Sequence, residues 1–358
     1  MINNSIKNQD INEFLFADSA PIHAVRTVTT FGKNSATYKF ALLHALLKRK
    51  DMTSHVIYDD LTEDFLQELV AHYSNNPHQF SRRENKLTKN IDVYLKTDRT
   101  PLDWNVLKET ARKNIFNDVF RAYQNVGSGS LTESHMLFED IRSEKRIVLT
   151  DSLMSVLEDE STKKVLHNEN QARWAVVEEA WKVGITPNIL SYNSEDGLFY
   201  SETKKHRIGL RSAVDTLSPY QKGRCFYCNR KVSKFVLSDH DDFSDIDHFF
   251  PISKLSKIDS SVPNPNGIWN LVVSCKKCNR GKEGKFDQPA DRQYYEALVK
   301  RNILFFEEHK HSLKNAISLS LGAKSKKDIL TRMVQIYKQF QPLRAWKPEY
   351  IFRTEDEK

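Results

Sequence analysis

Residues 266–285 read NGIWNLVVSCKKCNRGKEGK, and they close the region that decides the fold of this chain. They carry the second of two Cys-x-x-Cys pairs, and the first pair stands at residues 225–228 as CFYC. The pairs contain all 4 cysteines of the 358 residues. Disulfides are rare inside cells, whereas two such pairs are typical of a tetrahedral zinc site. The spacing therefore predicts a structural Zn²⁺ ion held by Cys225, Cys228, Cys275 and Cys278.

Between the two pairs, residues 243–251 read FSDIDHFFP, which predicts a strand that stops near Pro251. Hydrolysis of a phosphodiester needs an activated water and a cation that neutralises charge on the phosphate. His248 can supply the base, because an imidazole titrates near neutral pH. Neighbouring side chains on a strand face opposite ways, so Asp247 and His248 can serve one site only where the strand ends or twists. Asp245 shares a face with Asp247, and we interpret it as only a polar strand residue, with assistance to the metal as the alternative.

The order of these elements resembles the HNH (ββα-metal) nuclease family with an embedded four-cysteine zinc site. The resemblance covers roughly 60 of the 358 residues and includes both cysteine pairs, Asp-His with a proline three residues later, and Asn-Leu-Val. The third position of the family motif, often histidine, is Asn279 here, which gives an H-N-N pattern. The sequence is also similar to the HNH domain of RNA-guided CRISPR nucleases, in which an asparagine binds the metal.

This resemblance implies a role for each residue of the motif. Asp247 and Asn279 would bind a catalytic cation, His248 would activate the attacking water, and Asn270 would brace the loop and orient the base. An amide carbonyl oxygen suits a hard cation, so we expect Mg²⁺ or Mn²⁺ at the catalytic site and zinc only at the cysteines.

A group of basic residues follows, on what we expect to be the final helix of the domain: Lys276, Lys277, Arg280, Lys282 and Lys285. Cations that contact phosphates supply most of the affinity for nucleic acid, so this basic group predicts such a contact. A solvated helix face is the alternative interpretation. The chain as a whole has 54 Lys and Arg against 47 Asp and Glu, a mild excess that does not establish a partner. The aromatic residues of the region are expected to pack the domain rather than stack on bases: Phe226, Tyr227, Phe249, Phe250 and Trp269.

Elsewhere the sequence predicts a mainly α protein. Apolar residues at helical spacing predict helices at residues 36–50, 61–73, 101–123, 170–183, 291–311 and 326–340. Asp196-Gly197 predicts a hairpin over residues 191–201, and residues 127–130 are a candidate hinge. Residues 136–141 and 146–149 form either a hairpin or extensions of the flanking helices. We expect three parts, which are a helical region of unknown role at 1–205, the HNH domain at 206–290 and a helical extension at 291–358.

The function that the sequence favours is that of a metal-dependent HNH endonuclease that hydrolyses DNA, with each domain nicking one strand. A homodimer, a second site or repeated nicking would then give a double-strand break. The long helical region resembles those of bacterial restriction and anti-phage nucleases, so a partner ATPase or another defence subunit is expected. RNA is the alternative substrate, and a non-catalytic zinc-ribbon module that binds nucleic acid or protein is the alternative of another class.

Composition bounds the location of the protein. Hydrophobic residues make up 39% and charged residues 28%, as in ordinary globular chains. No apolar run approaches the roughly 20 residues of a membrane helix, and the polar N-terminus lacks the apolar core of a secretory signal peptide. We therefore expect a cytoplasmic protein with no membrane partner.

Overall fold

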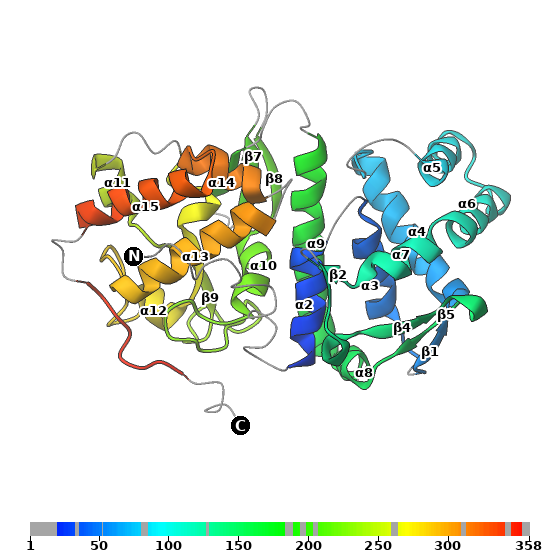
Figure 1. Cartoon of the computed structure of the whole chain (residues 1–358), viewed down its shortest axis with the longest axis horizontal. Helices are drawn as coiled ribbons and strands as arrows, with labels where there is room; N and C mark the ends of the chain where they lie inside the picture. The colour runs from blue at the N-terminus through cyan, green and yellow to red at the C-terminus, as the bar shows by residue number, and fades with distance from the viewer. Residues whose placement is uncertain are drawn as a thin grey trace. The chain divides into compact units, whose positions relative to one another are not determined.

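The computed structural model describes residues 20–32, 36–51, 53–79, 85–126, 129–182, 189–193, 198–202, 207–258, 264–308, 313–340 and 345–352. The described chain is mostly helical, with small antiparallel sheets (Figure 1). It divides into two compact units, unit 1 at Met1–Trp174 and unit 2 at Ala175–Lys358. The division falls inside the helix α9 (Glu160–Lys182), earlier than the boundary that the sequence predicted at residue 205.

Unit 1 contains helices and two small sheets. The first sheet has the strand order β1 (His55–Ile57), β5 (Arg146–Leu149) and β4 (Phe138–Ile141), so β4 and β5 form the hairpin that was one of two interpretations. Strands β2 (Asn125–Val126) and β3 (Gly129–Ser130) also pair, and residues 127–128 of the expected hinge lie outside the described residues. The helices before α9 are α2 (Pro21–Phe31), α3 (Tyr38–Lys48), α4 (Tyr58–Asn75), α5 (Lys86–Lys96), α6 (Pro101–Asn114), α7 (Phe116–Tyr123) and α8 (Asp151–Glu158).

Local sequence signals explain where α6 begins and ends. Thr100 accepts a hydrogen bond from the backbone N–H of Asp103, and the Asp103 carboxylate accepts one from the N–H of Thr100. This capping box, with Pro101 at the first position, starts the helix where the sequence predicted. The single helix expected over 101–123 is nevertheless two helices, because the chain turns at Ile115 and buries both Ile115 and Phe116.

Helix α2 was not predicted from the sequence, because polar residues such as His23, Arg26 and Thr27 are among its nine buried residues. Its threonine hydroxyls donate to backbone carbonyls one turn earlier, as Thr27 does to His23 and Thr30 does to Arg26. The Arg26 guanidinium donates to both carboxylate oxygens of Glu169 at 2.9 and 2.8 Å, and both side chains are buried. A bidentate ion pair therefore joins α2 to α9.

After the end of α9, unit 2 has a three-stranded antiparallel sheet of β6 (Ile189–Asn193), β7 (Leu198–Glu202) and β8 (Arg207–Ser212). Strands β6 and β7 pair as the predicted hairpin requires, and its Asp196-Gly197 turn lies outside the described residues. A two-stranded sheet of β9 (Ser244–His248) and β10 (Leu271–Cys275) follows. The helices of unit 2 after α9 are α10 (Ala213–Leu217), α11 (Ile252–Ile258), α12 (Lys276–Arg280), α13 (Arg292–Glu308), α14 (Leu313–Leu321) and α15 (Lys326–Phe340). Helices α13, α14 and α15 lie together (Figure 1), and α15 has the bounds that the sequence predicted.

One hydrophobic core holds unit 2 together. It includes Ala213 before the cysteine pairs, Val272 on β10, and Leu298, Met333 and Trp346 after them. The segments predicted as an HNH domain at 206–290 and a separate extension at 291–358 therefore share a core.

Helix α13 also fixes the loop that leads into β10. The buried Arg301 guanidinium donates to the carbonyl oxygens of Ile268 at 2.9 Å and of Trp269 at 3.2 Å. Asn302 donates to the same Trp269 oxygen at 2.8 Å. Burial lowers the pKa of Arg301 to about 9. Arg301 also donates to the carbonyl oxygen of Leu271, so helix α13 holds the residues on either side of Asn270.

Candidate functional site

The four cysteines meet in unit 2, where all four side chains are buried and the Sγ atoms lie within 4.8 Å of one another. The Sγ atoms of Cys228 and Cys275 are 3.7 Å apart. Four sulfurs at about 2.3 Å from a zinc ion in a tetrahedron are about 3.8 Å from one another. The cluster therefore has the geometry to hold a metal ion such as zinc, as the cysteine spacing predicted.

Backbone N–H groups that point at sulfur shape both cysteine turns. The N–H of Tyr227 donates to Cys225 Sγ at 3.4 Å, and the N–H of Cys278 donates to Cys275 Sγ at 3.4 Å. Burial raises the pKa of the Cys225 thiol well above its ordinary value. Thiolates in such surroundings need a cation, because a metal binds the deprotonated sulfur.

The second cysteine turn joins a strand pair to a short helix. Strand β9 runs antiparallel to β10, with Asp247 opposite Val272 and His248 opposite Leu271. Helix α12 starts directly after Cys275 and ends before Gly281, where a Cβ would lie 2.6 Å from the carbonyl oxygen of Lys277. The order is strand β9, a connection that contains α11, strand β10 and helix α12, with the second cysteine pair at the join between β10 and α12.

His248 is the last residue of β9, and its side chain is half-buried. Its Nε2 lies 3.0 Å from Oδ1 of Asn266. An imidazole that donates from Nε2 to this amide oxygen acts as a base through Nδ1. Burial lowers the pKa of His248, so the ring is neutral near pH 7, as a general base requires. Asn266 was not predicted as a site residue, because its place in the loop PNPNG carries no signal beyond that of a turn.

Asn270 is fully buried and ties the loop after β9 to the end of the loop before β10. Its Oδ1 accepts from the N–H of Phe250 at 2.8 Å, and its Nδ2 donates to the Phe250 carbonyl oxygen at 3.0 Å. Nδ2 also donates to the carbonyl oxygen of Pro265 at 3.0 Å. The Asn270 amide therefore braces the backbone two residues after His248.

Asp247 lies in a buried cluster with Lys285 and Tyr227. Its carboxylate oxygens are 3.2 and 3.1 Å from Nζ of Lys285, whose side chain is fully buried. The Tyr227 hydroxyl donates to Asp247 Oδ2 at 2.5 Å. Burial, with Asp247 alongside, raises the pKa of Tyr227 far above its usual range, so the phenol keeps the proton that it donates. Both oxygens of Asp247 are thus already bonded inside the protein.

Asn279 meets a different carboxylate, that of Asp245. Asn279 Nδ2 lies 3.4 Å from Asp245 Oδ2, and the Arg280 guanidinium donates to the same oxygen at 2.6 Å. The Arg280 side chain is 48% exposed, so it can leave this carboxylate for solvent. Asp245 offers the carboxylate oxygens that a hard cation prefers, and a half-turn of the Asn279 amide, which faces Asp245 with Nδ2, would present its oxygen to the same ion. In this structure the carboxylate that Asn279 contacts is that of Asp245, whereas Asp247, which the sequence paired with Asn279, contacts Lys285 and Tyr227.

The five basic residues do not share one helix, because Lys282 and Lys285 come after the end of α12. Lys277 and Lys282 are exposed, and Lys277 lies 3.7 Å from Glu349. Lys276 donates to the backbone oxygen of Asp239. Arg280 pairs with Asp245, and the buried Lys285 cannot reach a phosphate backbone from its place beside Asp247.

The aromatic residues pack as the sequence predicted. Tyr227, Phe249, Phe250 and Trp269 are buried, and Phe226 packs against the same core. Phe286 differs, since its side chain is 52% exposed and its φ of 45° is one that bulky side chains rarely adopt. Nothing in the sequence indicates this aromatic surface beside Lys285.

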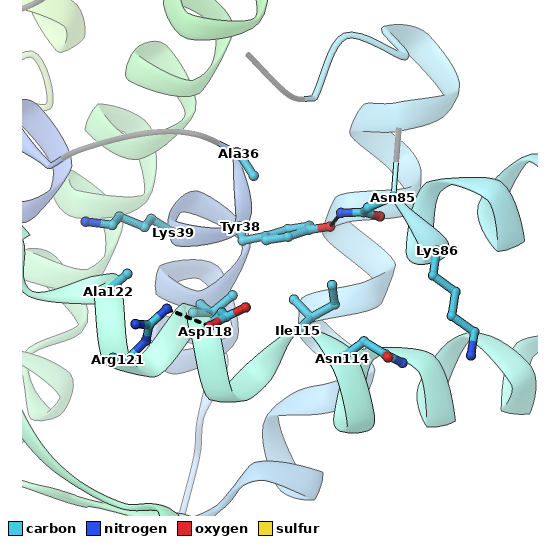
Figure 2. A pocket seen from close by; sticks show the side chains of 11 residues that line it. Ala36, Tyr38, Lys39, Asn85, Lys86, Asn114, Ile115, Asp118, Arg121 and Ala122 are labelled. Carbon is cyan, nitrogen blue, oxygen red and sulfur yellow. Dashed lines mark hydrogen bonds and ion pairs between the residues drawn. The ribbon is translucent and has the colours of Figure 1, made fainter. Parts of the chain in front are cut away.

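A pocket of about 440 Å³ with both polar and apolar lining residues lies in unit 1, away from these residues in sequence (Figure 2). The starts of α3 and α5 and the junction of α6 with α7 line it. The Tyr38 ring crosses the pocket, and its hydroxyl accepts from Asn85 Nδ2 at 2.5 Å. Arg121 is paired with Asp118 at 2.7 Å on the opposite wall. None of the predicted site residues lines this pocket.

Comparisons with protein-family models, with curated proteins and with solved structures found no match for this chain. Within the described residues, no helix is both long and apolar enough to cross a lipid bilayer. A functional assignment therefore depends on the residues of the site itself.

Proposed function

We propose that unit 2 is a metal-dependent endonuclease of the HNH type that hydrolyses phosphodiester bonds of DNA. The observation that carries this proposal is the environment of His248, a half-buried and neutral imidazole that is held by Asn266 at the end of β9. Two strands and a short helix around a four-cysteine cluster support it, because the HNH resemblance implies this order of elements.

His248 is the general base in the proposed reaction. It takes a proton from a water, and the resulting hydroxide attacks phosphorus in line with the departing 3′ oxygen. The 3′ oxygen takes a proton from solvent as the P–O bond breaks, which leaves 5′-phosphate and 3′-hydroxyl ends. Asn266 keeps the ring oriented, and Asn270 holds the backbone that follows. A divalent cation, when bound, would neutralise the charge that grows on the phosphate, with Asp245 and Asn279 as its oxygen ligands. The exposed Lys277 and Lys282 suit contacts to neighbouring phosphates.

The four cysteines are proposed to bind structural zinc. This ion would fix the first cysteine turn against β10 and the start of α12, which carries Asn279. The zinc therefore has no step in the reaction, and it holds the oxygen donors in place.

The experiment is an incubation of the purified, zinc-loaded chain with supercoiled plasmid, single-stranded DNA and total RNA in Mg²⁺ or Mn²⁺. Nicking of plasmid that stops when the divalent cation is omitted supports the proposal. Cleavage of RNA alone would show that RNA, and not DNA, is the substrate. Binding without cleavage of any of the three would favour the zinc-ribbon module and overturn the enzyme assignment.

We further propose that this activity serves bacterial restriction or anti-phage defence, with unit 1 contacting DNA or a partner subunit. The test is phage plating on cells that carry the gene and its neighbours. Plating should fall with the unaltered gene and recover with His248→Ala. Equal plating of a broad phage panel on both strains would contradict this role.

A further inference from the structure

Lys285 is a buried lysine with four oxygen atoms around its ammonium group. Nζ lies 3.2 and 3.1 Å from the two Asp247 oxygens, 3.0 Å from the carbonyl oxygen of His248 and 3.4 Å from that of Phe286. An ammonium group has three N–H donors, and this oxygen cage uses them all. A lysine is almost never fully buried unless it is paired in this way.

The same lysine connects the cysteine cluster to the end of β9. Its backbone N–H donates to the carbonyl oxygen of Cys278 at 2.7 Å, and its side chain donates to that of His248. The turn before Lys285 depends on Gly284, where a Cβ would lie 2.9 Å from backbone atoms of Gly281. Lys285 therefore links a cysteine of the cluster to the residue that carries the proposed base.

We propose that the Lys285 ammonium occupies the position beside Asp247 that a divalent cation would otherwise take. The ion pair of Lys285 with Asp247 then positions His248, and no divalent cation binds at this carboxylate. This inference rests on the proposed function, because it assigns a purpose to groups beside the proposed base. Asp247 is 6% exposed, and Tyr227 covers its second oxygen. A divalent ion at Asp247 would have to expel a buried ammonium, whereas at Asp245 it would displace a half-exposed guanidinium.

The first test measures Mn²⁺ binding to the zinc-loaded full chain by calorimetry. Asp247→Asn should keep the Kd for Mn²⁺ within about twofold, whereas Asp245→Asn and Asn279→Ala should each weaken it at least tenfold. Loss of Mn²⁺ binding in Asp247→Asn, with zinc content and circular dichroism unchanged, would overturn the proposal. Equal binding by all four proteins, or by none, would overturn the placement of the divalent cation at Asp245.

The second test follows the His248 imidazole by NMR, and it needs no nuclease activity. Lys285→Met should shift the His248 ring resonances, identified by their loss in His248→Gln, and Lys285→Arg should restore them in part. Lys338→Met, a lysine exposed on α15, is the matched control and should leave them unchanged. Unchanged His248 resonances in a folded Lys285→Met protein would overturn the positioning role.

Kinetics separate this role from a contact to nucleic acid. If the chain nicks DNA, Lys285→Met should lower kcat about 100-fold and leave KM within about twofold. A raised KM with an unchanged kcat would instead identify Lys285 as a phosphate contact and contradict the proposal. If the unaltered chain cuts no nucleic acid, the proposed function fails, while the NMR result still decides whether Lys285 orients His248.

Discussion

His248 Nε2 lies 3.0 Å from Oδ1 of Asn266, a residue from the loop that precedes β10. This contact joins the end of β9 to a loop that Asn270 and Arg301 hold from the other side. Because an amide oxygen accepts hydrogen bonds, this contact favours the ring tautomer with its proton on Nε2. In that tautomer Nδ1 is the nitrogen that can accept a proton from water. The orientation of the proposed base therefore depends on a residue outside the motif.

We predict that Asn266→Ala lowers kcat for plasmid nicking about tenfold, because a hydrogen bond of this kind is worth about 1–1.5 kcal/mol. The thermal midpoint should change little, since Asn266 is only partly buried. Asn105→Ala, at an exposed position on α6, is the matched control. An Asn266→Ala protein with full activity would show that the ring needs no such partner.

The pH profile should carry the signature of a buried base. Burial lowers the pKa of His248, so the ring stays neutral until the pH falls below the ordinary histidine value of about 6.5. We predict that kcat/KM is flat above this pH and falls as the ring is protonated below it. An acid limb with its midpoint above about 6.5 would contradict the assignment.

Removal of the metal from the cysteines should unfold the site. Structural zinc contributes about 10–16 kcal/mol of apparent binding free energy in small zinc domains. The contacts between four buried thiols without a metal are much weaker than the bonds to zinc. We predict one zinc ion per chain by metal analysis, and loss of both zinc and nicking in Cys275→Ser. A Cys275→Ser protein that keeps its zinc and its melting temperature would argue against the four-cysteine site.

Lys282 should contact phosphate and take no part in the hydrolysis step. Its side chain is exposed just after α12, close in sequence to Asn279. We predict that Lys282→Ala raises KM, leaves kcat within about twofold and reduces the slope of log K against log salt by about 1. Lys338→Ala is the control for loss of an exposed positive charge. An unchanged slope of log K against log salt would show that Lys282 is a solvated surface residue that does not contact phosphate.

The ion pair between Arg26 and Glu169 should matter for stability and not for catalysis. Both side chains are buried, so Glu169→Ala leaves a guanidinium without its partner and should cost about 3–5 kcal/mol of unfolding free energy. The double variant Arg26→Met with Glu169→Leu should recover most of this loss, as measured by urea denaturation. A single variant as stable as the double one would contradict a net role for the pair.

The sequence predicted those parts of the fold that local patterns determine. Two Cys-x-x-Cys pairs indicated the cluster, and an amphipathic pattern indicated α15 with its observed bounds. Helix α2 was not predicted, because its polar residues, such as Arg26 and Thr27, are buried, and a sequence pattern that expects polar residues at the surface does not indicate such a helix. The sharing of one core by residues on both sides of position 290 depends on contacts distant in sequence, which no local pattern records.

Within the candidate site, residue type indicated chemistry better than it indicated partners. His248 and Asn270 stand where a base and a brace are useful, at a strand end and in a buried loop. The partner of Asp247 did not follow from spacing, because Lys285 reaches it by a turn after α12 that directs its side chain inward. Lys285 therefore looked like the exposed lysines around it.

The most direct test of the central claim is the conversion of supercoiled plasmid to the nicked form by the zinc-loaded chain in Mn²⁺. We predict that the unaltered protein nicks DNA and that His248→Ala reduces the rate by at least about 100-fold, as loss of a general base does. His240→Ala, which removes an exposed histidine from the preceding loop, should retain full activity. Equal nicking by the unaltered protein and by a folded His248→Ala protein would contradict the assignment of His248 as the base.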